Sequence, residues 1–212
     1  KPDFANAHYN RGIILIDLGK LQEAELSTRK AIKLKPNYAE AYFNLGGILI
    51  DLKKPQEAFD SYLRVININP KYPNIYNVIT IFLRDSDPSN LDKNKLRSIL
   101  DHLLEMNDIF HKDLFKVFLF LYKDEFITYL NKLHTTFPLT ELSINEKPII
   151  NGLKKIIFRD PELERSLIKA RSKLCNRIAK SSTTNLSNPE LEFIIALGEQ
   201  CFLNEYVYPL NE

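Results

Sequence analysis

Three kinds of side chain recur in two stretches of this 212-residue sequence and together suit the binding of a peptide. Asparagine amides can hydrogen-bond a peptide backbone, aromatic rings can contact its side chains, and carboxylates can hold its basic groups. With their small and aliphatic neighbours, the candidate residues are Asn6, Tyr9, Asn10, Ile13, Asp17, Glu40, Phe43, Asn44, Gly47 and Asp51. We predict that these residues line one groove and that the partner is a protein or an extended peptide. The alternative is that the groove is too short to bind, and that these residues face water or the second half of the chain.

Groups for catalysis or metal binding are sparse. The histidines are isolated, with no second His or Cys at metal-ligand spacing, at His8, His102, His111 and His134. No glycine-rich turn after a strand is present to admit a cofactor. Glu199, Glu205 and Tyr206 could be grouped as an acid–base set, but any helix offers such combinations. We therefore predict no enzymatic activity, no metal and no cofactor for this chain.

An internal repeat positions the candidate groove. Residues 5–38 align with residues 39–72 without a gap, and 17 of the 34 positions are identical. Gly12 and Gly46 stand within predicted helices, where glycine costs about 1 kcal/mol relative to alanine, so each predicts the close approach of another helix. Ala24 and Ala58 have the matching small side chains on the second helix of each unit. A proline at 36 and at 70 ends that helix, because proline lacks the amide donor.

The repeat resembles the tetratricopeptide repeat, whose period is about 34 residues with two helices per unit. The second unit carries the family pattern as Tyr42-x-x-Leu45-Gly46-x-x-Leu49, Ala58-x-x-x-Tyr62 and Pro70. The first unit departs from it at Arg11 and Thr28. The resemblance implies an all-α fold, a right-handed α–α superhelix of helix pairs, followed here by a non-repeat helical region.

The same resemblance assigns roles to particular residues. In the subgroup with a Tyr-x-Asn-Leu-Gly-like first helix, which occurs ahead of glycosyltransferase domains, the asparagine hydrogen-bonds the backbone of a bound peptide. By position this role passes to Asn10 and Asn44. The basic clamp that other members use for peptide C-termini is absent, since Tyr9, Ile13 and Phe43 occupy its positions.

We predict that the chain divides into successive helical segments. Residues 1–4 align with the end of a repeat unit, so we expect a chain cut from a longer array. A turn at residues 85–90 interrupts the third unit, and residues 107–137 are predicted as two helices that divide between Lys123 and Asp124. Asp160-Pro161 and Asn188-Pro189 each predict a helix start. The predicted segments are 1–4, 5–38, 39–72, 73–106 (a degenerate unit), 107–137 (a helical pair), 138–148 (a linker) and 149–212.

The final segment carries a second resemblance. Residues 195–208 resemble a stretch that precedes a fused S-adenosylmethionine-dependent methyltransferase domain in bacterial tetratricopeptide proteins. This implies that the chain is the N-terminal, non-catalytic part of such a protein, with any catalytic domain beyond residue 212. The alternative function is therefore a helical accessory region of a methyltransferase or a glycosyltransferase-like enzyme.

Composition and charge limit which other kinds of partner this chain can have. No apolar run is long enough to span a membrane, and two cysteines, Cys175 and Cys201, suit buried thiols of a cytoplasmic protein. Residues 147–180 carry a charge of +7 and residues 181–212 a charge of −5, which we interpret first as mutual compensation. An acidic partner or nucleic acid would be alternatives, but stacking aromatics are not interleaved with the basic residues, so we predict no nucleic acid. The aromatic stretch at 110–122 is expected to pack internally, with self-association as a homo-oligomer as the alternative.

Overall fold

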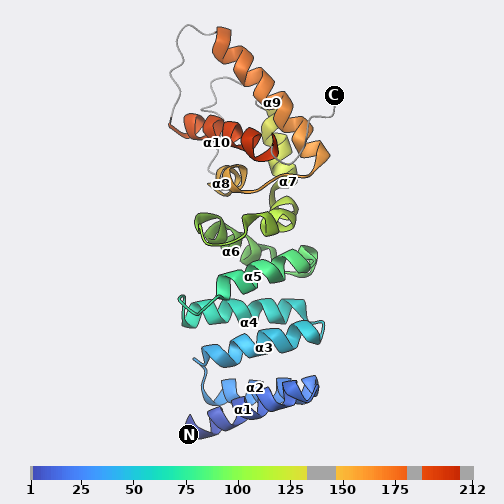
Figure 1. Cartoon of the computed structure of the whole chain (residues 1–212), viewed down its shortest axis with the longest axis vertical. Helices are drawn as coiled ribbons and strands as arrows, with labels where there is room; N and C mark the ends of the chain where they lie inside the picture. Colours follow the sequence, from blue (N-terminus) through green and yellow to red (C-terminus); the bar gives the residue numbers. More distant parts are fainter. Residues whose placement is uncertain (1, 133–146, 181–187, 206–212) are drawn as a thin grey trace. The chain divides into compact units, whose positions relative to one another are not determined.

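The computed structural model describes residues 2–132, 147–180 and 188–205, and the regular structure in these ranges is entirely helical (Figure 1). The all-α architecture predicted from the sequence is thereby confirmed. In chain order the elements are α1 (Pro2–Asp17), α2 (Leu21–Leu34), α3 (Ala39–Asp51), α4 (Pro55–Ile68), α5 (Ile75–Asp85), the 3-10 helix η1 (Pro88–Asn90), α6 (Lys93–Glu105), the 3-10 helix η2 (His111–Leu114), α7 (Phe115–Lys132), α8 (Lys147–Lys155), α9 (Pro161–Lys180) and α10 (Asn188–Glu205).

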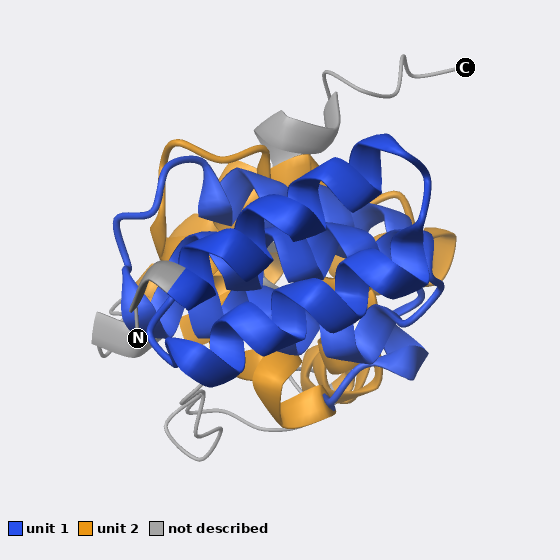
Figure 2. Cartoon of the chain, turned by 90° about the horizontal axis from the view of Figure 1, so that it is seen from below, with its two compact units in different colours: residues 1–92 blue, residues 93–212 orange. Residues whose placement is uncertain are grey.

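Two compact units make up the chain, residues 1–92 and residues 93–212 (Figure 2). The first contains α1 to α5 and the second contains α6 to α10. The division falls inside the segment 73–106. That this segment is a degenerate repeat unit stays a prediction. The linker predicted at 138–148 lies almost wholly outside the described residues, and its last two residues, Lys147 and Pro148, belong to α8.

In the first unit, helices α1 to α5 lie one above another (Figure 1). The predicted close approach at Gly46 is confirmed, because a Cβ atom on this residue would lie 2.7 Å from Cζ of Tyr62 on α4. Ala58 on α4 is fully buried, which agrees with its predicted small role. Helices α2 and α4 end at Leu34 and Ile68, two residues before each proline. The glycine, alanine and proline positions of the repeat therefore have the packing and helix-ending roles that the sequence predicts.

The departures of the first repeat from the family pattern have a packing explanation. Thr28 occupies the place that the Tyr62 ring takes one repeat later, and a Cβ on Gly12 would lie 2.6 Å from the Thr28 hydroxyl oxygen. Thr28 is itself buried. Arg11 is exposed, whereas Leu45, its equivalent on α3, is buried. Since α3 packs on α2, the second repeat buries a face that α1 leaves exposed.

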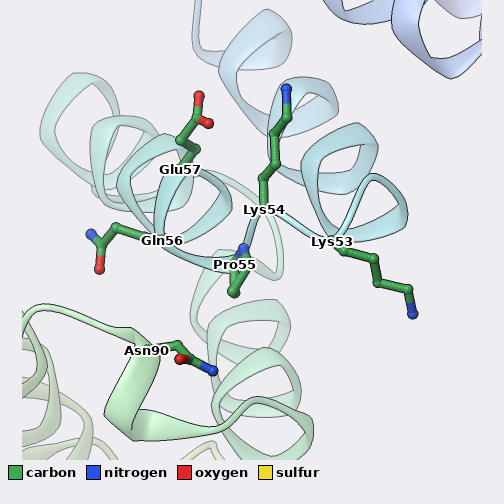
Figure 3. Close-up of a pocket in the computed structure, with 6 residues that line it drawn as sticks. All are labelled: Lys53, Lys54, Pro55, Gln56, Glu57 and Asn90. Carbon is green, nitrogen blue, oxygen red and sulfur yellow. The ribbon is translucent and has the colours of Figure 1, made fainter.

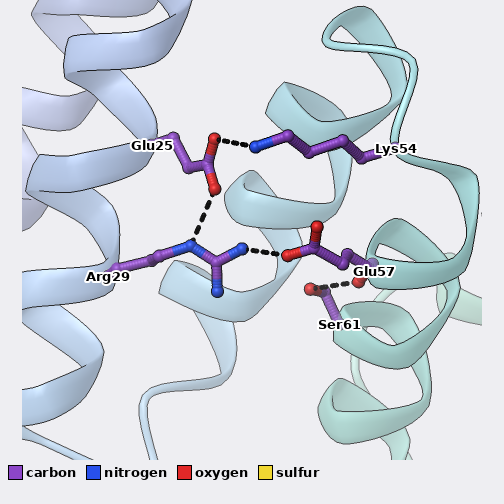
Figure 4. A network of polar contacts seen from close by, with 5 residues as sticks. All are labelled: Glu25, Arg29, Lys54, Glu57 and Ser61. Atoms are coloured by element: carbon purple, nitrogen blue, oxygen red, sulfur yellow. Dashed lines mark hydrogen bonds and ion pairs between the residues drawn. The ribbon is translucent and has the colours of Figure 1, made fainter.

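Ion pairs join α2 to the second helix pair (Figure 4). The Glu25 carboxylate accepts hydrogen bonds from Arg29 Nε and from Lys54 Nζ, each at 2.8 Å. Arg29 also pairs with Glu57, whose backbone carbonyl accepts a hydrogen bond from the Ser61 hydroxyl at 2.8 Å. Burial alone would raise the pKa of Glu25, but the hydrogen bonds from Lys54 and Arg29 outweigh it, and this pKa falls below its ordinary value.

In the second unit, α7 corrects one prediction. This helix runs without interruption from Phe115 to Lys132, so the predicted division between Lys123 and Asp124 is wrong. Charged residues there do not break the helix because they have no special backbone requirement, and Lys123 forms ion pairs with Asp160 at 2.8 Å and Glu162 at 3.0 Å. Asp124 is a residue type that can cap a helix start, but no proline or glycine stands beside it, and the helix continues through it.

The aromatic stretch mostly packs within the second unit, as predicted. Phe118 and Tyr122 are buried, and the Phe118 ring centroid lies 5.3 Å from that of Phe158. A Cβ on Gly152 of α8 would lie 2.7 Å from Cζ of Phe118, so α7 and α8 approach closely there. Phe110 and Phe120 differ, with 68% and 40% of their surfaces exposed.

The start of α9 confirms the predicted cap. The Leu163 backbone amide donates to the Asp160 carboxylate at 2.9 Å, and Pro161 occupies the first helical position. Helix α10 is described from Asn188, but the side chains of its first residues lie outside the described set, as do those of Cys175 and Cys201.

The predicted compensation between the basic segment 147–180 and the acidic segment 181–212 stays a prediction. Lys147 pairs with Glu105 on α6, and Lys155 donates to the Met106 carbonyl at 2.8 Å. Among the described residues no ion pair joins α9 to α10; α9 packs on α7 and α10 packs on α8. Helix α8 of the basic segment thus packs against α10 of the acidic segment, while the ion pairs described for residues 147–162 go to α6 and α7.

No helix in the described ranges combines the length and the apolar character needed to cross a lipid bilayer.

Candidate functional site

All of the predicted groove residues lie on α1 and α3, and none of them is buried. They fall into two environments, which alternate along α1 but not along α3. The exposed ones are Asn6, Asn10, Asp17, Glu40 and Asp51. The half-buried ones are Tyr9, Ile13, Phe43, Asn44 and Gly47. The two helices thus present polar groups to solvent with aromatic and aliphatic groups beneath them.

One hydrogen bond connects the predicted groove residues of α1 with those of α3. The Asn44 side-chain amide on α3 donates to the Tyr9 hydroxyl on α1 at 3.2 Å. Part of the Asn44 donor capacity is therefore used within the protein, while its side-chain oxygen has no bond to a described residue. Asn10, its equivalent 34 residues earlier, is exposed and makes no described side-chain hydrogen bond. The two asparagines are equivalent by sequence but differ in environment.

Aromatic contacts repeat with the sequence. The Tyr9 and Tyr38 ring centroids are 4.9 Å apart, and those of Phe43 and Tyr72 are 5.2 Å apart. Both members of the second pair lie 34 residues after their counterparts in the first. We call these four residues the aromatic cluster. Tyr38 and Tyr72 were not among the predicted groove residues, although their spacing in the repeat is a signal that could have identified them.

The carboxylate of Glu40 is close enough to this cluster to affect its titration. Burial, and then the charges of Glu40 and Tyr9, raise the pKa of Tyr72. Burial also raises the pKa of Tyr38, with smaller contributions from Tyr9 and Glu40. The Tyr38 and Tyr72 phenols therefore stay protonated at neutral pH. Glu40 itself forms no ion pair with a described residue. The Lys35 ammonium lies 4.1 Å from the Tyr38 ring centroid, so this ring accepts a cation from its own chain.

A hollow of about 320 Å³ lies along α3, and we call it the α3 cavity. Four predicted residues line it, together with four that sequence reasoning missed. The lining residues are Ile16, Phe43, Asn44, Gly47, Ile48, Ile50, Asp51 and Tyr62. A Cβ on Gly47 would meet no atom within 4 Å, so the space beside this residue is open. The other predicted residues, Asn6, Tyr9, Asn10, Ile13, Asp17 and Glu40, do not line it.

The α3 cavity carries one carboxylate. Burial, and secondarily the charge of Asp51, raises the pKa of Tyr62 to about 12, so the Tyr62 phenol is neutral at physiological pH. Asp51 is exposed and forms no ion pair within the part of the chain that the structure describes. The cavity therefore combines aliphatic and aromatic walls with one negative charge.

A second hollow, of about 410 Å³, lies where α3 turns into α4 (Figure 3). Its lining residues are Lys53, Lys54, Pro55, Gln56, Glu57 and Asn90. Two of its charged groups are already used, because Lys54 pairs with Glu25 and Glu57 pairs with Arg29. The Gln56 side-chain oxygen also accepts the Asp92 backbone amide at 2.7 Å. This hollow thus offers fewer available groups than the α3 cavity.

Among the residues that the structure describes, no group of three or more His, Cys, Asp or Glu side chains is arranged to hold a metal ion.

The geometry of residues 5–72 defines a class of protein, a repeat of helix pairs. Comparison with protein-family models agrees: residues 5–38 and residues 39–72 each match a model described as tetratricopeptide repeat. Residues 5–72 of this chain are therefore two tetratricopeptide repeats. Such repeats generally form scaffolds for protein–protein interaction. A comparison with curated proteins found no match.

Proposed function

We propose that the face formed by α1 and α3 binds an extended peptide segment of a partner protein, and that this chain acts by binding and not by catalysis. The observation that carries the proposal is that α1 and α3 carry accessible polar side chains together with members of the aromatic cluster and the lining of the α3 cavity. Amides and carboxylates on top can pair with a peptide backbone and its basic groups, while the rings and the cavity can take side chains.

Two asparagines have the central role in this proposal. Asn10 is exposed, and Asn44 keeps its side-chain oxygen available while its amide nitrogen bonds Tyr9. Each net hydrogen bond in a complex is worth about 0.5–1.5 kcal/mol, so removal of both amides is expected to weaken binding about tenfold. The face should tolerate this change, since neither side chain is buried.

The test is selection of peptides from a random library by the immobilised full chain, followed by fluorescence polarisation with the selected peptides. The double variant Asn10→Ala/Asn44→Ala is compared with wild type, and Asn94→Ala, exposed on α6, serves as the control. Weaker binding by the double variant alone supports the proposal. Equal binding by all three proteins, or a wild type that selects no peptide, would refute it.

We infer a second candidate role, self-association, from one observation in the second unit. Phe110 is 68% exposed, and Phe120 40%, although Phe118 and Tyr122 of the same stretch are buried. Sedimentation equilibrium of wild type and of Phe110→Ala tests this role. A dimer that the variant loses would support self-association, and a wild-type monomer at all concentrations would exclude it.

A further inference from the structure

The α3 cavity has walls suited to a methylene chain. Ile16 comes from α1, Ile50 and Phe43 come from α3, and all three line the cavity. Ile50 is exposed, with 39% of its surface open to solvent. Long basic side chains commonly bury their methylene groups against apolar surface and keep the charged end in a polar environment. The walls therefore match the stem of lysine or arginine.

The polar end of the cavity is a single carboxylate whose charge is not neutralised. Asp51 ends α3, and the residue at the same place one repeat later, Asp85, ends α5. Asp85 is paired with Arg84 at 2.7 Å, whereas Asp51 forms no ion pair with a described residue. The residue before Asp51 is Ile50; of the two lysines that follow it, Lys54 pairs with Glu25, and Lys53 forms no ion pair with Asp51. A cation from a ligand would complete the pair.

The size of the cavity favours one side chain over a cofactor. Pockets for small molecules span about 300–1,000 Å³, and this hollow of about 320 Å³ is at the lower limit. Its open space exists because Gly47 has no side chain and because a Cβ there would meet no neighbour within 4 Å. The Asn44 amide, at the same cavity, is placed to hydrogen-bond the peptide backbone next to the inserted side chain.

We infer that the α3 cavity binds one lysine or arginine side chain of a peptide ligand, with the methylene stem against Ile16 and Ile50 and the cationic group paired with Asp51. This inference rests on the proposed function, because it names the peptide residue that the α1–α3 face recognises. A charge-assisted pair of this kind is stronger than a neutral hydrogen bond and weakens as salt concentration rises.

Two substitutions test the inference without disturbing the fold. Asp51→Asn removes the charge and keeps the shape, and Glu23→Gln, an exposed carboxylate on α2 outside the cavity, is its charge-matched control. Gly47→Leu fills the open space, and Gly198→Leu on α10, where a Cβ also meets no atom within 4 Å, is its control. Far-UV circular dichroism checks that each variant is folded.

The experiment is peptide selection by the wild-type chain from a random library, followed by sequencing of the retained pool. We expect lysine or arginine to be enriched at one position. Replacing that residue by norleucine, which keeps the stem and removes the charge, should weaken binding to wild type about tenfold or more. The same replacement should have little effect on binding to Asp51→Asn, and Gly47→Leu should bind the basic peptide as weakly as wild type binds the norleucine peptide.

The outcomes separate the two proposals. A wild type that selects peptides without an enriched basic residue would overturn this inference and leave the peptide-binding function standing. The inference is overturned in the same way if Asp51→Asn and Gly47→Leu bind the selected peptides as tightly as wild type and the two controls do. A wild type that retains no peptide overturns the proposed function, and this inference with it.

Discussion

Adjacent glycines on α3 allow a sharp test of the packing. Gly46→Ala and Gly47→Ala make the same chemical change one residue apart, within the same helix. Each should gain about 1 kcal/mol from helix propensity, so this contribution cancels when the two variants are compared. The environments differ completely, because a Cβ on Gly47 meets nothing within 4 Å, whereas a Cβ on Gly46 meets the Tyr62 ring.

The expected penalty at Gly46 follows from the contact distances. The added carbon would lie 2.7 Å from Cζ and 2.8 Å from Cδ1 of Tyr62. Carbon atoms in favourable contact are about 3.5–4.0 Å apart, so the overlap approaches 1 Å. The ring cannot move away easily, because Tyr62 is only 3% exposed and packs against Phe43 and Phe82, each at a centroid distance of 6.0 Å. Overpacking of this kind costs about 1–3 kcal/mol.

We therefore expect Gly47→Ala to be more stable than wild type by about 1 kcal/mol, and Gly46→Ala to be less stable than Gly47→Ala by about 1–3 kcal/mol. Urea unfolding followed by far-UV circular dichroism measures both differences. In a Tyr62→Leu background the overlap is relieved, so Gly46→Ala should cost less there than in wild type. Equal stabilities of the two alanine variants would show that the close approach of α3 and α4 is not as described.

Three further changes have predicted outcomes. Glu25→Gln should lower the free energy of unfolding by about 1 kcal/mol above pH 5. Because folding lowers the pKa of Glu25, this loss of stability should shrink as the pH falls through the lowered pKa. Urea titrations at several pH values measure the loss, and a loss that does not depend on pH would contradict the prediction. Asp160→Ala removes the cap of α9 together with the ion pair to Lys123 and should cost about 1 kcal/mol or more. Faster amide hydrogen exchange confined to the first turn of α9 is expected from loss of the cap, and unchanged exchange there would argue against it. Gly152→Ala places a methyl group against Phe118 and should destabilise the chain relative to Gly198→Ala by about 1–3 kcal/mol in urea unfolding; the reverse order would disprove the contact.

Local features could be predicted from the sequence because their causes lie within one helix or turn. The 34-residue period predicted the helix pairs of the first unit, and a mid-helix glycine at 46 predicted the close contact with α4. The Asp160-Pro161 pair predicted the start of α9, since capping involves residues only three apart. The prediction at Lys123–Asp124 was wrong because a capping residue type alone does not end a helix, and no proline or glycine stood beside it.

Contacts between distant residues required the tertiary structure. Net charge alone could not say which helices of the basic and acidic segments would meet: α9 packs on α7, and α8 packs on α10. The aromatic cluster and the α3 cavity combine residues from separate helices, such as Ile16 with Asp51, and no local pattern specifies their side-chain positions. The repeat therefore determines the helices and the face on which candidate residues lie, while packing between helices decides which of those residues meet around an open space and a charge.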